Sequence, residues 1–275
     1  MDKKAIKTFA VNAREKLIED AKFQASLLGI TENGIEEPIN TTKDMETYSL
    51  GGSSTHSIYD DQINQRKNLV KEIENKGYEN VMEEVAYTWF NRIIAIRFME
   101  VNNYLPAKIR ILSSENKNKI EPDIITEVFQ TDISFTNEEK EKIIRLKEEN
   151  KSDELFQYLF IKECNELNKY LPALFEKTND FTELLLNISY INSDGIIREL
   201  VDMVPEEDFK NQVEIIGWLY QYYNSELKDK IFADLKKNVK ITKENIPPAT
   251  QIFTPHWIVK YMVENSLGRL WLESQ

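Results

Sequence analysis

Hydrophobic residues recur at helical spacing along most of the chain. Residues 2–28 carry apolar side chains three, four or seven positions apart, which predicts one amphipathic helix that ends at Gly29. The positions concerned are Ile6, Phe9, Ala10, Ala13, Leu17, Ala21 and Leu28. A second helix is predicted over 61–76, because one face is apolar and Gly77 follows it. The pattern favours a mainly α-helical, multi-helix protein.

The most apolar segment runs from residue 81 to 101. Its apolar side chains cover most of the helix circumference, which is typical of a buried helix. Arg92 and Arg97 lie within it, and a buried arginine needs a partner because an unpaired buried charge costs several kcal/mol. Partners are expected among acidic residues of this or other helices, including Glu83, Glu84 and Glu100. The alternative is that the two arginines face a ligand phosphate.

Helical patterns continue beyond Pro106. Thr136 and Glu139 have the spacing of a capping box, and Asp153 opens a helix whose apolar face includes Cys164. That placement favours a packed thiol over a nucleophile. Three more helical stretches are predicted over 181–188, 196–203 and 213–222. The aromatic residues of the last stretch are expected in the core, with base stacking as the alternative.

Residues 31–60 lack helical periodicity and contain several Gly, Pro, Ser and Thr residues. They are predicted to form a loop or linker. The expected organisation is therefore an N-terminal helix over 1–30, the linker over 31–60, and a helical domain over 61–246.

Composition narrows the choice of fold and chemistry. The chain has eight glycines in 275 residues, against about 19 expected at average usage, which disfavours sandwiches, barrels and doubly wound sheets. One cysteine and two histidines exclude a disulfide framework, and neither a multi-thiolate nor a histidine-rich metal site is expected. No metal ligands are predicted.

The charge is unevenly distributed. The formal net charge is −12, and nearly all of it lies in 29–60 and 111–210. A surface that binds DNA needs clustered Lys and Arg, so 111–210 is expected to repel DNA and to present solvated helix faces. The chain shows neither a long apolar run nor a secretory leader, and a cytoplasmic protein with no membrane partner is expected.

Catalytic signatures such as GxGxxG, HExxH and GxSxG are missing from the sequence. Pro122-Asp123 followed by Glu138-Glu139-Lys140 imitates a metal-dependent nuclease pattern. That chemistry needs its carboxylates on adjacent strands, whereas Glu138 opens a predicted helix. The match is attributed to chance, and no catalytic residue is predicted.

The most specific segment lies near the C-terminus, at Gln251-Ile252-Phe253-Thr254-Pro255. Gln251 to Phe253 are predicted to form a short β-like stretch. Thr254 is predicted as the N-cap and Pro255 as the first residue of the helix that follows. Free N–H groups at this helix start, together with the Thr254 hydroxyl, favour contact with an anion such as a carboxylate.

This segment resembles motif X of the amino-group DNA methyltransferases in type I and type IIG restriction-modification systems. Residues 7–20 (KTFAVNAREKLIED) and 77–106 (GYENVMEEVAYTWFNRIIAIRFMEVNNYLP) further resemble the N-terminal region of the PglX-type adenine-specific methyltransferases of BREX phage-defence systems. The resemblance covers essentially the whole chain. It implies that 247–275 is the start of an α/β methyltransferase domain.

The family resemblance also implies a cofactor. In that family motif X contributes to the S-adenosylmethionine pocket, so Phe253, Thr254 and Pro255 are the expected cofactor-binding residues. The family's Asn-Pro-Pro-[Tyr/Phe] motif, which holds the target adenine, does not occur in this chain. The sequence is therefore interpreted as an N-terminal fragment, inactive alone, of an enzyme that methylates adenine N6 in DNA.

Two other functions are considered. One is the N-terminal part of a type IIG restriction-modification enzyme that carries its own nuclease. The other is an acidic helical interaction module without a catalytic role. As part of a methyltransferase, the region is expected to support the catalytic domain, to contact other defence-system proteins, or to help clamp DNA.

Overall fold

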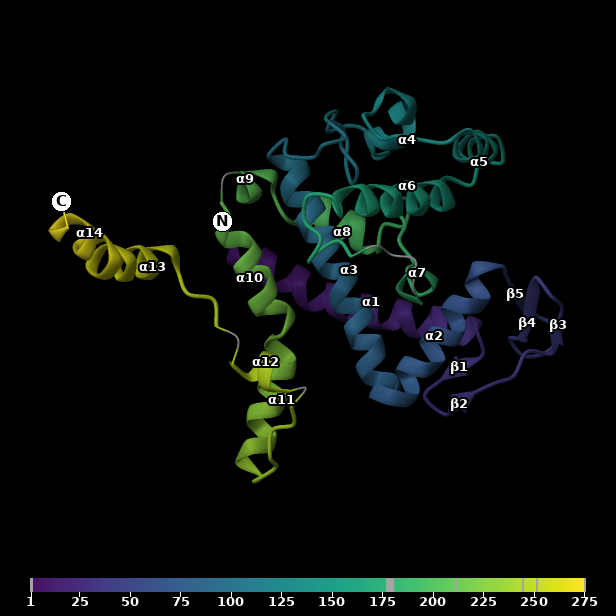
Figure 1. Cartoon of the computed structure of the whole chain (residues 1–275), viewed down its shortest axis with the longest axis horizontal. Helices are drawn as coiled ribbons and strands as arrows, with labels where there is room; N and C mark the ends of the chain where they lie inside the picture. Colours follow the sequence, from purple (N-terminus) through teal and green to yellow (C-terminus); the bar gives the residue numbers. More distant parts are fainter. Residues whose placement is uncertain (1, 177–180, 211, 244, 251, 275) are drawn as a thin grey trace. The chain divides into compact units, whose positions relative to one another are not determined.

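The computed structural model describes residues 2–176, 181–210, 212–243, 245–250 and 252–274 (Figure 1). Helices make up 61% of the structure and strands 6%, which confirms the mainly α prediction.

The chain divides into two compact units. The larger unit comprises residues 12–203, and the smaller comprises 1–11 together with 204–275. Helix α1 (Lys3–Leu27) has its first residues in the smaller unit and the remainder in the larger one.

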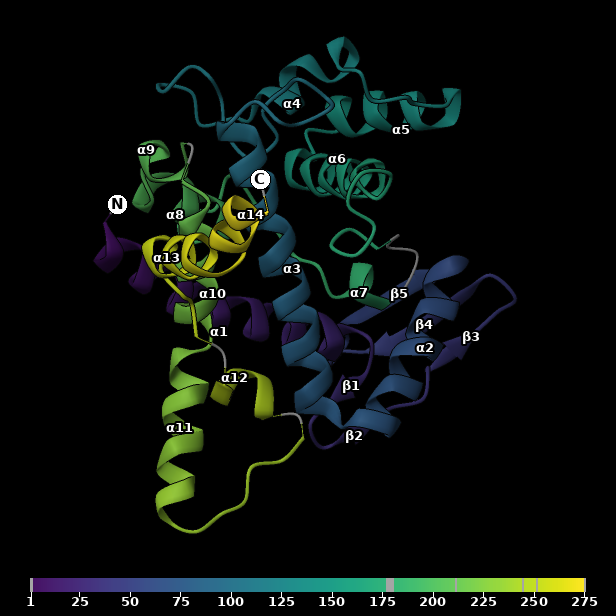
Figure 2. The ribbon, with the colours of Figure 1, turned by 60° about the vertical axis from the view of Figure 1, so that its left-hand side comes forward.

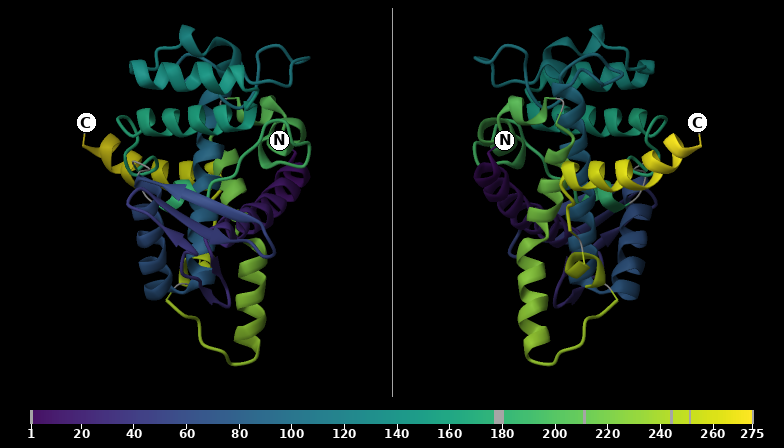
Figure 3. Two further views of the ribbon diagram at one scale, coloured as in Figure 1. Left: turned by 90° about the vertical axis from the view of Figure 1, so that its right-hand side faces the viewer. Right: turned by 90° about the vertical axis from the view of Figure 1, so that its left-hand side faces the viewer.

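The larger unit is built mainly from helices. These are α2 (Asp61–Lys76), α3 (Tyr78–Val101), α4 (Asp123–Glu127), the 3-10 turn η1 (Val128–Gln130), α5 (Asn137–Glu148), α6 (Ser152–Leu167), α7 (Phe181–Leu184) and α8 (Ile196–Met203). Helix α3 packs against α2, and α6 lies beside α5 (Figure 3). The bounds of α1, α2 and α3 match the predicted ranges 2–28, 61–76 and 81–101 closely.

Helix α3 carries much of the core. Its apolar residues are buried on nearly all sides, and Trp89 packs against Phe160 of α6 with ring centroids 6.1 Å apart.

The predicted capping box at α5 is present: the Thr136 hydroxyl accepts the Glu139 N–H, and the Glu139 carboxylate accepts the Thr136 N–H. Cys164 is fully buried on α6, and this burial raises the pKa of its thiol. The predicted packed thiol is confirmed.

Both buried arginines of α3 have protein partners. Arg92 donates to the backbone carbonyls of Leu174 and Glu176. Arg97 Nη1 lies 2.6 Å from the Glu100 carboxylate, which was one of the expected partners. Both arginines therefore have partners within the larger unit: an acidic residue for Arg97, as expected, and backbone carbonyls for Arg92.

Residues 31–60 are not a loop, contrary to the prediction. They contain five short strands, β1 (Ile30–Thr31), β2 (Gly34–Ile35), β3 (Asn40–Thr41), β4 (Met45–Ser49) and β5 (Thr55–Tyr59). Strands β1 and β2 pair antiparallel, and β3-β4-β5 form an antiparallel sheet. Gly51 and Gly52, both at positive φ, form the turn between β4 and β5. One face of β4 and β5 is buried through Tyr48 and Ile58, which stabilises a sheet that short strands could not sustain alone.

Arg66 of α2 ties this region to the end of α1. Its guanidinium donates to the carbonyls of Leu28 and Glu36 and stacks 4.2 Å above the Tyr48 ring. Strand β5 also contacts α2, as Figure 2 shows. The strands are therefore an integral part of the larger unit.

The smaller unit contains only helices among its described residues. They are α9 (Glu206–Phe209), α10 (Glu214–Tyr223), α11 (Ser225–Lys236), α12 (Ile246–Thr250), α13 (His256–Val263), the π-turn η2 (Glu264–Gly268) and α14 (Arg269–Glu273). Helix α12 packs beside α11, and α13, η2 and α14 follow one another as one helical segment (Figure 2). This segment is called the C-terminal helix below. In the part of the chain that the structure describes, no helix has the length and hydropathy needed to cross a membrane.

Candidate functional site

The motif X-like segment connects α12 to α13. Ile252 to Pro255 adopt irregular backbone, and Gln251 lies outside the described residues. The expected β-like stretch therefore does not form at Ile252 or Phe253. The physical reason is that a strand needs a partner for its backbone hydrogen bonds, and the described part of the smaller unit offers only helices.

Instead of pairing with a strand, the segment docks on helix α10 through Phe253. The Phe253 ring packs over Gly217 and meets Trp218 edge-on, with centroids 5.0 Å apart. A Cβ at Gly217 would lie 2.8 Å from Phe253 Cγ and even closer to Cδ2 and Cε2. Any residue larger than glycine at position 217 would therefore clash with the Phe253 ring.

Two hydrogen bonds join the same pair of segments. The Phe253 N–H donates to the Gln221 side-chain oxygen at 3.1 Å, and the His256 N–H donates to the Glu214 carboxylate at 2.8 Å. Glu214, Gly217 and Gln221 are three and four positions apart, so they share one face of α10. These three residues are called the α10 row below.

The start of α13 differs from the prediction by one residue. Pro255 has extended backbone, with ψ at 144°, and is the N-cap, while the helix begins at His256. Thr254 precedes the cap and is exposed, so it is not the N-cap, and Pro255 is not the first helical residue. The Glu214 carboxylate, rather than the Thr254 hydroxyl, accepts the first N–H of the helix.

The three predicted cofactor residues are thus adjacent, and their environments differ. Phe253 and Pro255 are half-buried, whereas Thr254 is exposed. The structure brings Phe253 together with a glycine, an amide and an aromatic residue of α10. Sequence reasoning missed the α10 row, although the isolated Gly217 inside a helical pattern was a usable signal. A mid-helix glycine is destabilising and commonly marks close packing.

The C-terminal helix exposes an unusual number of large apolar side chains. None of its residues is buried. The exposed ones are Trp257, Val259, Tyr261, Met262, Val263, Leu267, Leu270, Trp271 and Leu272. Exposed apolar side chains that are this numerous on one helix are typical of an interaction site.

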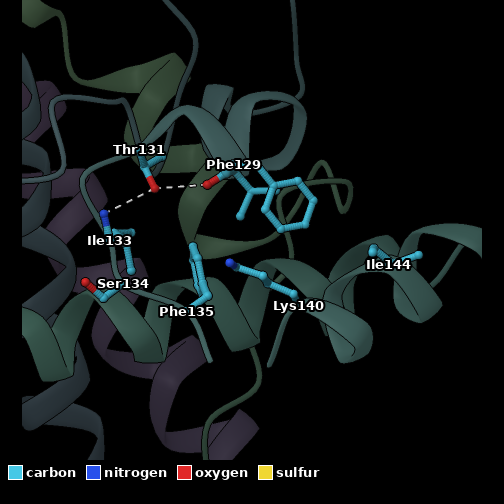
Figure 4. A pocket seen from close by; sticks show the side chains of 8 residues that line it. Phe129, Thr131, Ile133, Ser134, Phe135, Lys140 and Ile144 are labelled. Atoms are coloured by element: carbon cyan, nitrogen blue, oxygen red, sulfur yellow. Dashed lines mark hydrogen bonds between the residues drawn. The ribbon is translucent and has the colours of Figure 1, made fainter. Parts of the chain in front are cut away.

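The larger unit contains a pocket of about 550 Å³ between η1 and α5. Figure 4 shows Lys140 of α5 extending to this pocket, which Phe129, Ile133 and Phe135 also line. Thr131 shapes its rim, because the Thr131 hydroxyl donates to the Val128 carbonyl and accepts the Ile133 N–H. Polar and apolar groups share its lining, and Lys140 is the one ionisable residue among the lining residues, so the pocket lacks a pair of groups suited to acid–base catalysis.

A second cleft of about 800 Å³ in the larger unit is lined by polar and apolar groups, with several charged side chains among them. Its cations have partners: Lys162 pairs with Glu139 at 2.6 Å, and Lys142 lies 4.2 Å above the Tyr158 ring. Burial lowers the pKa of Lys142. The two lysine side chains therefore have partners within the cleft, which is typical of a structural role.

The residues of the nuclease-like pattern lie on different helices and have local hydrogen bonds. Asp123 accepts from the Ser114 hydroxyl and the Glu115 N–H, and Glu139 belongs to the capping box. Within the described residues, no group of three or more His, Cys, Asp or Glu side chains is arranged to hold a metal ion.

Glu163 is a buried carboxyl that the sequence did not single out. It is 1% exposed, and its Oε1 has no hydrogen-bond partner among the described residues. Burial, and to a smaller extent the charge of Glu166, raises the pKa of Glu163 to about 7. Glu163 lies among the buried residues of α6, so its raised pKa reflects desolvation in the core.

Comparison with known proteins agrees with the sequence resemblance. No protein-family model matches the chain. The adenine-specific methyltransferase PglX of Lacticaseibacillus casei (strain Zhang) is 48% identical over 99% of the chain. The chain is a homologue of part of the PglX-type adenine-specific methyltransferases. The adenine-specific methyltransferase BrxX of Escherichia coli O9:H4 (strain HS) is 37% identical over 100% of the chain.

The match extends over this whole chain but covers a minor part of each relative. The chain spans 23% of the length of PglX and 22% of the length of BrxX. Because both relatives match along essentially the whole chain, the predicted resemblance to PglX-type enzymes is confirmed.

Proposed function

We propose that this chain acts as a segment of an S-adenosylmethionine-dependent adenine-N6 DNA methyltransferase of a BREX-type phage-defence system. The observation that carries the proposal is the match of essentially the whole chain to two adenine-specific methyltransferases. In this role the helical units support the catalytic domain, and the remainder of the enzyme supplies the groups that hold the adenine. The acidic stretch 111–210 favours contact with other proteins over contact with DNA.

The C-terminal helix is the element that joins this segment to the catalytic domain. Its exposed apolar side chains supply the surface that such a domain would bury. The Thr254 hydroxyl is exposed at the start of this helix, where a ligand can reach it.

Phe253, Thr254 and Pro255 are proposed to line one side of the cofactor pocket. Their chemistry fits the amino-acid end of S-adenosylmethionine in part: Thr254 offers a hydroxyl, whereas the His256 N–H at the start of α13 is already bonded to the Glu214 carboxylate. Phe253 gives an apolar wall, and Pro255 fixes the direction in which the helix begins. S-adenosylmethionine supplies the methyl group when it is bound.

The proposal is tested by the Thr254→Ala variant of the full-length enzyme. We expect cofactor affinity, measured by calorimetric titration, to fall while the melting temperature stays near that of the wild type. Since Thr254 is not the N-cap, the loss of about 1 kcal/mol typical of a removed cap should not occur. Unchanged cofactor affinity would remove Thr254 from the cofactor site.

The 275-residue chain alone is proposed to lack methyl transfer. A methyl donor must be held in line with the amine, and positioning provides much of the rate enhancement. Tritium transfer from labelled S-adenosylmethionine to DNA should stay at background. Clear transfer by the purified chain would contradict this assignment.

A further inference from the structure

One face of α10 contacts the motif X-like segment at successive points. The α10 row consists of Glu214, Gly217 and Gln221: Gly217 meets the Phe253 ring, Gln221 accepts the Phe253 N–H, and Glu214 accepts the N–H of His256, directly after the segment. Both partners belong to the smaller unit. The contacts combine one close packing interaction with two hydrogen bonds to the main chain.

The two hydrogen bonds bracket Thr254. Gln221 accepts the N–H of the residue before it, and Glu214 accepts the N–H two residues after it. The main chain is thus held on both sides of the exposed Thr254 hydroxyl. Because both acceptors are side chains on one rigid helix, the position of Thr254 follows that of α10.

Gly217 decides how close the segment can lie. The Phe253 ring packs directly over the Gly217 backbone, and the ring edge also meets Trp218, which itself stacks on Tyr222 at 5.8 Å. A side chain at position 217 would force the whole ring away, since the overlap reaches Cγ. A glycine in the middle of α10 destabilises the helix, but it allows Phe253 to dock closely.

We propose that the α10 row positions Phe253 and Thr254 for cofactor binding, with Gly217, Gln221 and Glu214 as positioning residues that do not touch the cofactor. This inference rests on the proposed function of Phe253 and Thr254. It adds three residues, some 30 to 40 positions upstream of the motif, to the determinants of cofactor affinity.

The first test uses the 275-residue chain and needs no cofactor. In Gly217→Ala, amide hydrogen exchange at Phe253 and His256 should accelerate about tenfold or more, because displacement of the docked ring moves both amides away from their acceptors on α10. The near-ultraviolet circular dichroism attributable to Trp218 should change as well. Unchanged exchange at both amides would overturn the docked arrangement.

The matched substitutions are made at Gln221. Gln221→Glu keeps an oxygen acceptor for the Phe253 N–H, whereas Gln221→Ala removes it. Only Gln221→Ala should accelerate exchange at Phe253. This pair keeps the proposal testable even if Gly217→Ala fails to fold, and equal behaviour of the two variants would contradict the role of Gln221.

The second test measures S-adenosylmethionine in the full-length enzyme. Gly217→Ala should raise KM for the cofactor about tenfold, the size expected for loss of one such contact, with a smaller change in kcat. Adding Phe253→Leu to Gly217→Ala should restore part of the affinity, because the smaller side chain relieves the overlap. Additive losses in the double variant would contradict positioning through Phe253.

The two proposals fail in different ways. If Phe253→Ala and Thr254→Ala leave cofactor affinity unchanged, the proposed function of these residues is wrong. If Phe253→Ala weakens the cofactor but Gly217→Ala and Gln221→Ala do not, only the positioning role of the α10 row is wrong.

Discussion

Glu100 is the residue whose removal should most destabilise the larger unit. Its carboxylate is fully buried and accepts four hydrogen bonds, from Arg97 Nη1 at 2.6 Å, the Ser113 hydroxyl at 2.7 Å, and the N–H groups of Ile111 at 2.7 Å and Leu112 at 2.6 Å. These bonds join the end of α3 to the connection that follows it. Glu100→Ala removes all of them in one step.

The expected loss follows from the groups that remain. Arg97 stays in place with its side chain 1% exposed, and removing one partner of a buried ion pair costs about 3–5 kcal/mol. Two buried N–H groups also lose their acceptor, each at about 1–3 kcal/mol when left unsatisfied. Because these terms overlap and the site relaxes, we expect a total loss of about 4 kcal/mol.

The measurement is urea unfolding followed by circular dichroism, with Glu84→Ala as the control. Glu84 lies on the same helix but pairs with Lys76 at the surface, where the two side chains are 53% and 46% exposed. Removal of such a surface pair costs under about 1 kcal/mol. If Glu100→Ala loses no more stability than Glu84→Ala, the reasoning about the buried network is wrong.

Three further predictions concern single residues or the whole chain. The pKa of Glu163 is raised to about 7, so its protonated form stabilises the fold below pH 4.5, and this contribution is lost as the pH rises through 7. In paired denaturation curves, Glu163→Gln should therefore be more stable than the wild type at pH 8 but not at pH 4. Thr136→Ala should lower the free energy of unfolding by about 1 kcal/mol, whereas Thr136→Ser should be nearly neutral. The chain should form no complex with DNA in a gel shift at moderate salt, since its net charge is −12.

The first helices and the cap of α5 were predictable because their signals are local, whereas the cap predicted at Thr254 was wrong. The period of apolar residues placed α1, α2 and α3 within a few residues, and the Thr136–Glu139 spacing identified a cap that the structure contains. Glu100, one helical turn away from Arg97, was among the acidic residues expected to pair with the two arginines, and it does pair with Arg97. All of these follow from neighbours within four positions.

The sheet was missed because its strands lack alternation. Met45–Ser49 and Thr55–Tyr59 are long enough to show a strand pattern, but apolar and polar residues do not alternate along either of them. The Gly51-Gly52 turn between two stretches rich in Thr, Tyr and Ile was the available clue.

The candidate site was predicted only in part, for a different reason. Its three residues are contiguous in sequence, so a motif revealed them. The surface on which they dock lies on α10, more than 30 residues earlier, and no local pattern links Gly217 to Phe253. The predicted strand was wrong for the same reason, since strand formation depends on a distant partner.

The exposed C-terminal helix also affects how this part of the protein folds. From His256 to Glu273 its own support consists of ion pairs such as Lys260–Glu264 and Arg269–Glu273, each worth a few tenths of a kcal/mol at most. A solitary helix of this length is only marginally stable in water. Its winding and its burial are therefore one coupled event, in which the entropy lost on ordering the backbone is offset only when apolar surface leaves water. We therefore expect the segment to be only partly helical until that contact forms, so that the contact which covers it also completes its fold.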